Sequence, residues 1–219
     1  MKQKIKMAMP SYFVILSVFF SVCIILIKKA ATWNSIGVIL DCNFALLAII
    51  IFSNTFYVER QLHTLDVYSL APRKKVEADI LNRVVIKTAF LFLLFILTYL
   101  VYIVRRPDIY MGESKVNIFL NAIFAGWSSI LFWGALSLLL VNLFSNLWIG
   151  VCTTVLLWGI MTSTIARKVP VFIDVFRYGN LDINGIQLPN WQLGKIVCLI
   201  SGIVFIWLNT YLIKRRPYK

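Results

Sequence analysis

Few residues in this chain belong to the types that carry out catalysis, and their positions restrict the chemistry open to them. His63 is the only histidine and lies outside the apolar runs, so the sequence holds neither an HExxH metal helix nor an intramembrane Ser-His pair. Asp41 is the only acidic residue within an apolar run, whereas an intramembrane aspartyl protease needs two facing carboxylates. The only Gly-Lys pair, Gly194–Lys195, lacks the spacing of a phosphate-binding GxxxxGK[ST] loop. The sequence therefore predicts no catalytic residue and no nucleotide hydrolysis by this chain.

The four cysteines do not form a metal-binding pattern. Cys23, Cys42, Cys152 and Cys198 each lie within an apolar run, and no two of them have CxxC spacing. Free cysteines in such surroundings behave as small buried hydrophobic residues. We expect no metal site, no disulfide framework and no cofactor bound by this chain.

Asp41 and the nearby Asn43 are the polar residues most open to a functional role. An ionised carboxylate within a membrane span is costly unless it faces water, a partner or the interface. Asp41 lies close to the outer start of the second apolar run, so one interpretation is a helix end that solvent reaches. In a second interpretation, Asp41 and Asn43 line a path for a substrate. A buried carboxylic acid, or a misplaced boundary of the span, is the third.

The composition requires membrane-spanning helices to position these residues. Hydrophobic residues make up 60% of the 219 residues and charged residues only 14%, whereas soluble domains have roughly 25% charged residues. About 20 consecutive apolar residues form a helix that crosses the hydrocarbon. We predict an all-α membrane protein with a single transmembrane domain over residues 1–219, and we divide its long fourth apolar stretch at a turn over Asn142–Asn146. The six expected spans are 11–27, 36–58, 84–104, 116–141, 147–165 and 196–213.

The positive charges indicate contact with lipid and give the expected orientation. The net charge is +13, and the Lys and Arg residues cluster at the ends of apolar runs, which suits anionic headgroups and argues against a nucleic-acid partner. Six spans put both termini on one side, and the positive-inside rule favours the cytoplasm for that side. Lys87, one turn inside the third span, is expected to reach the cytoplasmic headgroups. The long outer connection 166–195 weakens the bias through Arg167, Lys168, Arg177 and Lys195.

The connection between the second and third spans, Val58–Arg83, has a helical pattern of its own. Apolar residues fall on one stripe through Leu62 and Leu65, which predicts a short amphipathic helix at the inner membrane face. Pro72 ends this helix, and a second helical pattern then leads into the third span. An interfacial loop without further function fits the periodicity equally well.

At these residues the sequence resembles the membrane subunits of ABC-2 type transporters. That family places a Glu at the cytoplasmic end of its second span, followed by a Thr-Leu pair, a short helix, a Pro and a basic cluster. The matching residues here are Glu59, Thr64, Leu65, the short helix Asp66, Val67, Tyr68, Ser69 and Leu70, then Pro72 and Arg73–Lys75. His63 stands where the family often has Gly.

The resemblance implies half of the membrane pathway of an ATP-driven exporter in a bacterial cytoplasmic membrane. The short helix at Thr64–Leu70, flanked by Glu59 and Pro72, would then be a coupling helix that docks on a separate ABC ATPase subunit, which binds ATP and Mg, and a second permease subunit would complete the pathway. The family commonly forms re-entrant or surface helices between spans five and six, and Val169–Tyr178 has the apolar content for this on the extracellular side. Aromatic residues in the spans favour an amphipathic cargo, with a peptide as the first choice. The alternative is a membrane scaffold or assembly factor without transport activity.

Overall fold

A computed structural model describes the backbone of residues 8–30, 32–55, 73–104, 114–163, 170, 173–179 and 190–215. Within these ranges the regular structure consists of six α-helices and one short 3-10 helix. They are α2 (Ser11–Ile27), α3 (Trp33–Ser53), α6 (Arg73–Val104), α7 (Lys115–Phe144), α8 (Leu147–Thr162), η2 (Arg177–Gly179) and α9 (Trp191–Arg215).

The helices have the lengths and surfaces of a membrane protein. Helices α3, α6, α7 and α9 are long and apolar enough to cross a membrane. Helices α2 and α8 are apolar but have only 17 and 16 residues, fewer than the roughly 20 residues of a typical span. Large apolar side chains such as Ile15, Phe19, Leu156 and Trp207 are more than 60% exposed, which suits a surface covered by lipid. The chain is therefore an all-helical membrane protein in the part that the structure describes.

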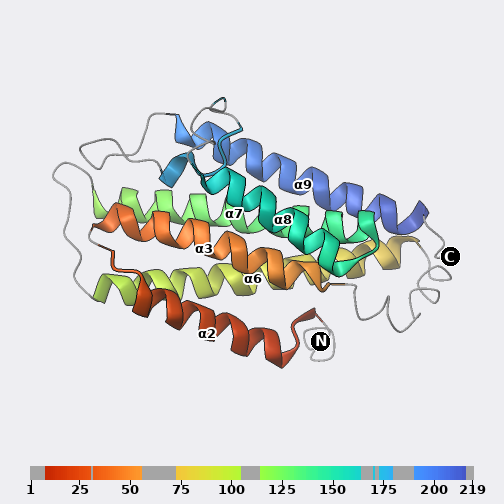
Figure 1. Cartoon of the computed structure of the whole chain (residues 1–219), viewed down its shortest axis with the longest axis horizontal. Helices are drawn as coiled ribbons and strands as arrows, with labels where there is room; N and C mark the ends of the chain where they lie inside the picture. The colour runs from red at the N-terminus through yellow and green to blue at the C-terminus, as the bar shows by residue number, and fades with distance from the viewer. Residues whose placement is uncertain are drawn as a thin grey trace.

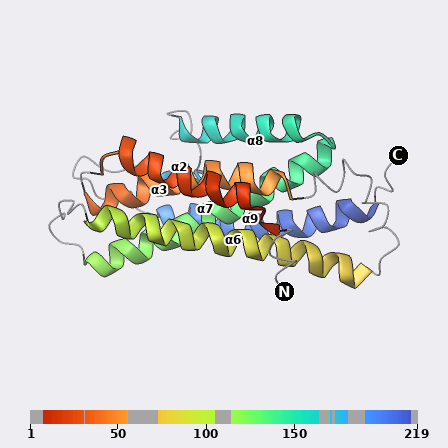
Figure 2. The same ribbon diagram turned by 90° about the horizontal axis from the view of Figure 1, so that it is seen from below.

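Helices α3 and α7 form the centre of the bundle (Figures 1 and 2). Helix α3 packs along α7, and α7 in turn contacts α8 and α9. Helices α2 and α6 cover another side of α3, where the rings of Phe44 and Phe95 meet edge to face at 5.3 Å. Small residues allow this close packing: Gly37 lies against Ala122 and Tyr178, and Gly134 lies against the ring of Phe52. A polar residue on the inner face of α3 is thus enclosed by several helices.

The ends of α3 differ from the span expected at 36–58. Its start is a capping box, in which the Thr32 hydroxyl accepts from the Ser35 N–H and the Thr32 N–H donates to the Ser35 hydroxyl. Its last residue is Ser53, five residues before the expected end, and Asn54 forms the C-cap. Thr55 therefore lies beyond the end of the helix, where its side chain can accept a hydrogen bond from a neighbouring helix.

Helices α7 and α8 are joined by a turn at Ser145–Asn146, within the stretch Asn142–Asn146 where the sequence predicted one. Ser145 adopts a left-handed conformation with φ 54°, which ends α7, and the Asn146 side chain accepts hydrogen bonds from the N–H groups of Trp148 and Ile149 at the start of α8. Asn142 is not part of the turn. It remains in α7 and donates a 2.5 Å hydrogen bond to Asn209 of α9.

The C-terminal end of α3 is held by two basic residues of α6. The Lys87 ammonium donates to the Ile51 carbonyl at 2.8 Å and to the Thr55 hydroxyl at 2.9 Å, and the Arg83 guanidinium donates to the Thr55 carbonyl at 3.0 Å. Lys87 is 1% exposed, so the expectation that it reaches the headgroups is wrong. The last carbonyls of a helix lack intrahelical partners and carry partial negative charge, which explains why a buried cation settles there.

Candidate functional site: a buried ion pair between α3 and α9

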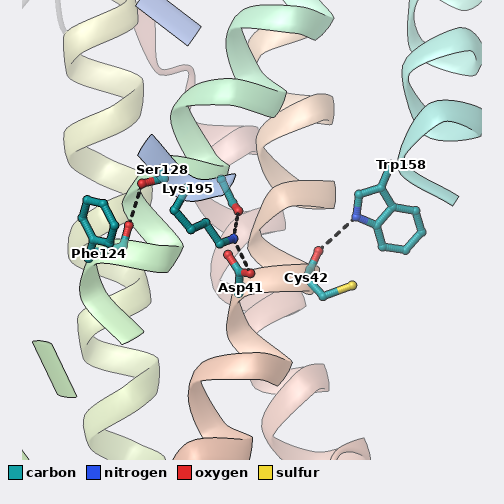
Figure 3. A network of polar contacts seen from close by, with 7 residues as sticks. Asp41, Cys42, Phe124, Ser128, Trp158 and Lys195 are labelled. Carbon is teal, nitrogen blue, oxygen red and sulfur yellow. Dashed lines mark hydrogen bonds and ion pairs between the residues drawn. The ribbon is translucent and has the colours of Figure 1, made fainter. Parts of the chain in front are cut away.

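An ion pair joins the middle of α3 to the first turns of α9. The Nζ atom of Lys195 lies 2.6 Å from Oδ2 of Asp41 and 2.7 Å from the hydroxyl oxygen of Ser129 on α7 (Figure 3). Three helices that are distant in sequence therefore meet at one ammonium group. Helix α9 begins at Trp191, earlier than the span expected from residue 196, and this extension carries Lys195 into the bundle.

Both charged side chains are removed from solvent. Lys195 and Asp41 are each 1% exposed, and Ser129 is 0% exposed. Asp41 lies two residues before the middle of the 21-residue α3, which corresponds to about 3 Å along the axis. Desolvating two ions at such a depth is unfavourable unless they are paired and hydrogen-bonded. The short contacts of Lys195 meet this requirement.

Residues 173–179 cover the ion pair from the side of η2. The Phe176 ring centroid lies 5.5 Å from the Lys195 ammonium, and the same ring stacks on Trp133 at 5.9 Å. Tyr178 packs edge to face on Trp191 at 4.8 Å. Val175, Phe176 and Tyr178 are buried, as is Asp174. This segment thereby places an aromatic ring over the buried cation and ties α7 and α9 together around it.

Two buried polar atoms near the ion pair make no hydrogen bond to a described residue. One is Oδ1 of Asp41, the carboxylate oxygen that does not contact Lys195, and the other is Nε1 of Trp133, one helical turn beyond Ser129. Buried polar atoms are nearly always paired, so such atoms mark a place where the packing can change or accept another group.

The structure excludes one of the interpretations of Asp41, and the substrate path stays a prediction. A helix end reached by solvent is wrong, because the carboxylate is buried and paired with a lysine that the sequence placed in an outer loop. Asn43 does not join the site: two residues further along the helix it points about 200° away. Its amide donates to the Ile39 carbonyl of its own helix at 2.7 Å. A signal for Lys195 does exist in the sequence, since Trp191 and Leu193 extend the apolar pattern of α9 toward its start.

The residues expected to dock on an ATPase, Glu59, Thr64–Leu70 and Pro72, lie outside the described part of the chain. The structure describes what flanks them: α3 ends at Ser53, and α6 begins at Arg73 directly after Pro72. Their predicted role stays a prediction.

The described residues also bear on metal and disulfide chemistry. No group of three or more His, Cys, Asp or Glu side chains there is placed to hold a metal ion, and all four cysteines are free thiols. The Trp158 indole N–H donates to the Cys42 carbonyl at 3.2 Å, which fixes α8 on α3 beside the ion pair (Figure 3).

The fold and the site define a class, an all-helical membrane protein with a charged pair buried between its helices. Comparisons of the chain with protein-family models, curated proteins and solved structures gave no match.

Proposed function

We propose that this chain is the membrane-spanning permease subunit of an ATP-driven ABC-2 type exporter in a bacterial cytoplasmic membrane. It would work with a separate ABC ATPase subunit and a second permease subunit, and both of its termini would be cytoplasmic. The proposal rests on the Glu59–Lys75 pattern and on the position of that pattern between the end of α3 and the start of α6.

The contacts that α3 makes at two points along its length are the observation that best supports movement within the bundle. One end of this helix leads into the pattern at 59–75 and is bonded to α6 through Lys87 and Arg83. Its middle is bonded to α9 through Asp41 and Lys195. If the coupling helix displaces the end of α3, the contacts of Lys87 and Arg83 make α6 move with it. The Asp41–Lys195 pair between α3 and α9 then comes under strain. In the proposed cycle the bundle would therefore alternate between the observed arrangement, in which the pair is closed, and one in which it is open.

In the proposed cycle, ATP and Mg bind to the partner ATPase and close its dimer, and the coupling helix passes this movement to α3. Such a cycle requires ATP to bind the two arrangements with different affinity. The cargo would be amphipathic, with a peptide as first choice. Residues 173–179 would form part of an extracellular re-entrant segment that opens with the ion pair.

The test combines Leu65→Ala with Tyr68→Ala in the proposed coupling helix. Both side chains offer apolar area of the kind that dominates protein interfaces. We expect normal membrane insertion, weak capture of the ATPase in a quantitative pull-down, and loss of cargo efflux from cells. Lys115→Ala, at the start of α7 and therefore at the opposite end of the bundle, serves as the control and should leave both readouts unchanged.

The Glu59→Ala variant tests whether docking on the ATPase and transmission of its movement to the spans depend on different residues. Its position at the end of the predicted second span suits transmission of movement, so we expect impaired efflux with near-normal ATPase capture. Normal capture and efflux in the Leu65 and Tyr68 double variant would overturn the coupling-helix assignment. Partner capture by the wild type without any ATP-dependent efflux would favour the membrane scaffold.

A further inference from the structure

An open apolar groove of about 700 Å³ runs between α6, α7 and α9. Helix α6 lines one wall from Leu81 to Phe92, a length of about 16 Å along the helix axis. Helix α9 lines the other wall from Ile203 to Thr210, and Leu131 of α7 lies at the base, packed beneath Gly202. The helices that form the groove are candidate membrane spans, so the groove lies at hydrocarbon depth.

The lining of the groove favours an apolar occupant. Its only hydroxyl-bearing side chains are Thr88 and Thr210, and each donates its proton to a carbonyl of its own helix, Val84 and Ile206, at 2.9 Å. Aliphatic side chains line most of the rest, together with the rings of Phe92, Trp127 and Trp207, and the Phe92 and Trp127 ring centroids lie 5.3 Å apart. The two threonine hydroxyls are therefore engaged, and the indole N–H groups of Trp127 and Trp207 are the only other side-chain donors among the lining residues.

The groove is long and open on one side. Its lining extends for about 16 Å along α6, and its volume is about 700 Å³. An extended acyl chain is narrow and flexible enough to lie along such a groove.

One end of the groove carries more positive than negative residues. Helix α6 begins with Arg73, Lys74 and Lys75, and helix α9 ends with Lys214 and Arg215, whereas the first turns of α6 also hold Glu77 and Asp79. Asp79 pairs with Arg83 at 3.1 Å. The start of α6 and the end of α9 lie at the same end of the bundle (Figure 1). Leu81 and Thr210 are the lining residues nearest these basic positions in sequence. Five positive residues at a membrane surface attract anionic headgroups.

We propose that this groove is a binding site for an anionic phospholipid, with one acyl chain in the groove and the phosphate at the basic ends of α6 and α9. Every lipid in the bilayer has an equally apolar tail that can enter the groove. The tail therefore contributes to binding but hardly distinguishes one lipid from another. The preference must come from the headgroup charge. This predicts selectivity between lipids that differ only in their headgroup.

The experiment uses the purified full-length chain equilibrated with equal amounts of phosphatidylglycerol and phosphatidylcholine that carry identical acyl chains. Retained lipid is counted by native mass spectrometry. We expect phosphatidylglycerol to be enriched at least about fivefold, the ratio that a single favourable charge contact of this type provides.

Two variant pairs test the two halves of the site. Ala89→Trp fills the groove and should abolish retention of lipid, whereas Leu97→Trp, on an exposed part of α6 that does not line the groove, should not. Lys214→Gln with Arg215→Gln should reduce the preference for phosphatidylglycerol while tail retention continues. Lys28→Gln with Lys29→Gln, beyond the end of α2, removes the same charge elsewhere and should have no effect.

Helical content and a monodisperse elution profile must match the wild type in each variant, and a second filling variant, Val85→Trp, replaces any that fails. Equal retention of the two lipids, or retention unchanged by filling the groove, would overturn the proposal. A change of oligomeric mass in the filled variants without a change in bound lipid would assign the groove to a protein partner and would overturn it as well.

Discussion

Two lysines of this protein are equally buried, each 1% exposed, but they are accommodated in different ways. Lys195 meets the carboxylate of Asp41 near the middle of α3. Lys87 meets the Ile51 carbonyl and the Thr55 hydroxyl at the C-terminal end of the same helix. One helix therefore receives two cations, one through a side chain and one largely through its backbone.

The difference follows from where a helix has unused hydrogen-bonding capacity. In the middle of α3 the backbone carbonyls already accept intrahelical hydrogen bonds and carry no net charge, so the carboxylate of Asp41 compensates the buried ammonium there. At the end of α3 the last carbonyls are unpaired and the helix dipole favours positive charge.

The two contacts consequently suit different tasks. A pair of side chains can separate and reform when α9 shifts against α3, whereas a lysine bonded to a helix end makes α3 and α6 move together. This distinction underlies the proposal that the Asp41–Lys195 pair opens and closes during transport.

The largest effect is expected from Asp41→Asn, which keeps the shape of the side chain and removes its charge. Lys195 would then be buried without a carboxylate, and we expect a loss of about 3 kcal/mol in the free energy of unfolding. Denaturation in detergent micelles followed by circular dichroism measures this. Asn43→Ala is the control, because Asn43 bonds only within its own helix in the structure, and it should cost less than about 1 kcal/mol. Equal losses at the two positions would show that Asp41 contributes no more to the free energy of unfolding than Asn43 does.

A smaller effect is expected from Lys87→Met, which keeps the length of the side chain and removes the ammonium. Charge-assisted hydrogen bonds contribute about 1.5–3 kcal/mol, and we expect a loss of about 2 kcal/mol because the backbone groups at the end of α3 remain and can rearrange. Hydrogen exchange should increase at the last turn of α3. Lys115→Met, an exposed lysine whose ammonium lies 5.7 Å from the Trp33 ring centroid, should cost below about 1 kcal/mol. Unchanged exchange at residues 50–53 would contradict the capping role of Lys87.

The smallest effect is expected from Ser129→Ala. This substitution removes one of the acceptors of the Lys195 ammonium but leaves the ion pair, so we expect a loss of about 1 kcal/mol. The neighbouring Ser128 provides a matched control, since its hydroxyl is also buried but donates to the Phe124 carbonyl of its own helix (Figure 3). Ser128→Ala should cost less than Ser129→Ala. The reverse order would show that Ser129 does not support the cation.

Hydropathy alone predicted the helices well where they are uninterrupted. It located α2 at its observed bounds and the start of α8 at Leu147, because apolar runs and a turn rich in Asn and Ser are local signals. The bounds of α3 and α9 were less accurate. The predicted end of α3 was five residues late, so the carbonyls at the true end of the helix, which bind Lys87, were not recognised. The predicted start of α9 was also five residues late, which placed Lys195 in a loop.

The ion pair itself could not be predicted from one sequence. Asp41 and Lys195 are 154 residues apart, and their meeting depends on how α3, α7 and α9 pack together. Asp41 was recognised as costly within a span, but nothing local identifies its partner. The groove between α6, α7 and α9 likewise arises from three helices and has no signature in any one of them.

The central claim is that Asp41 and Lys195 act on each other and not merely on their surroundings. A double-mutant cycle measures this directly from the unfolding free energies of the wild type, Asp41→Asn, Lys195→Gln and the double variant in detergent micelles. If the pair stabilises the bundle as described, the two single losses should not add, and the coupling energy should reach about 2 kcal/mol. Losses that add to within about 0.5 kcal/mol would mean that the two side chains act independently, and would contradict the account.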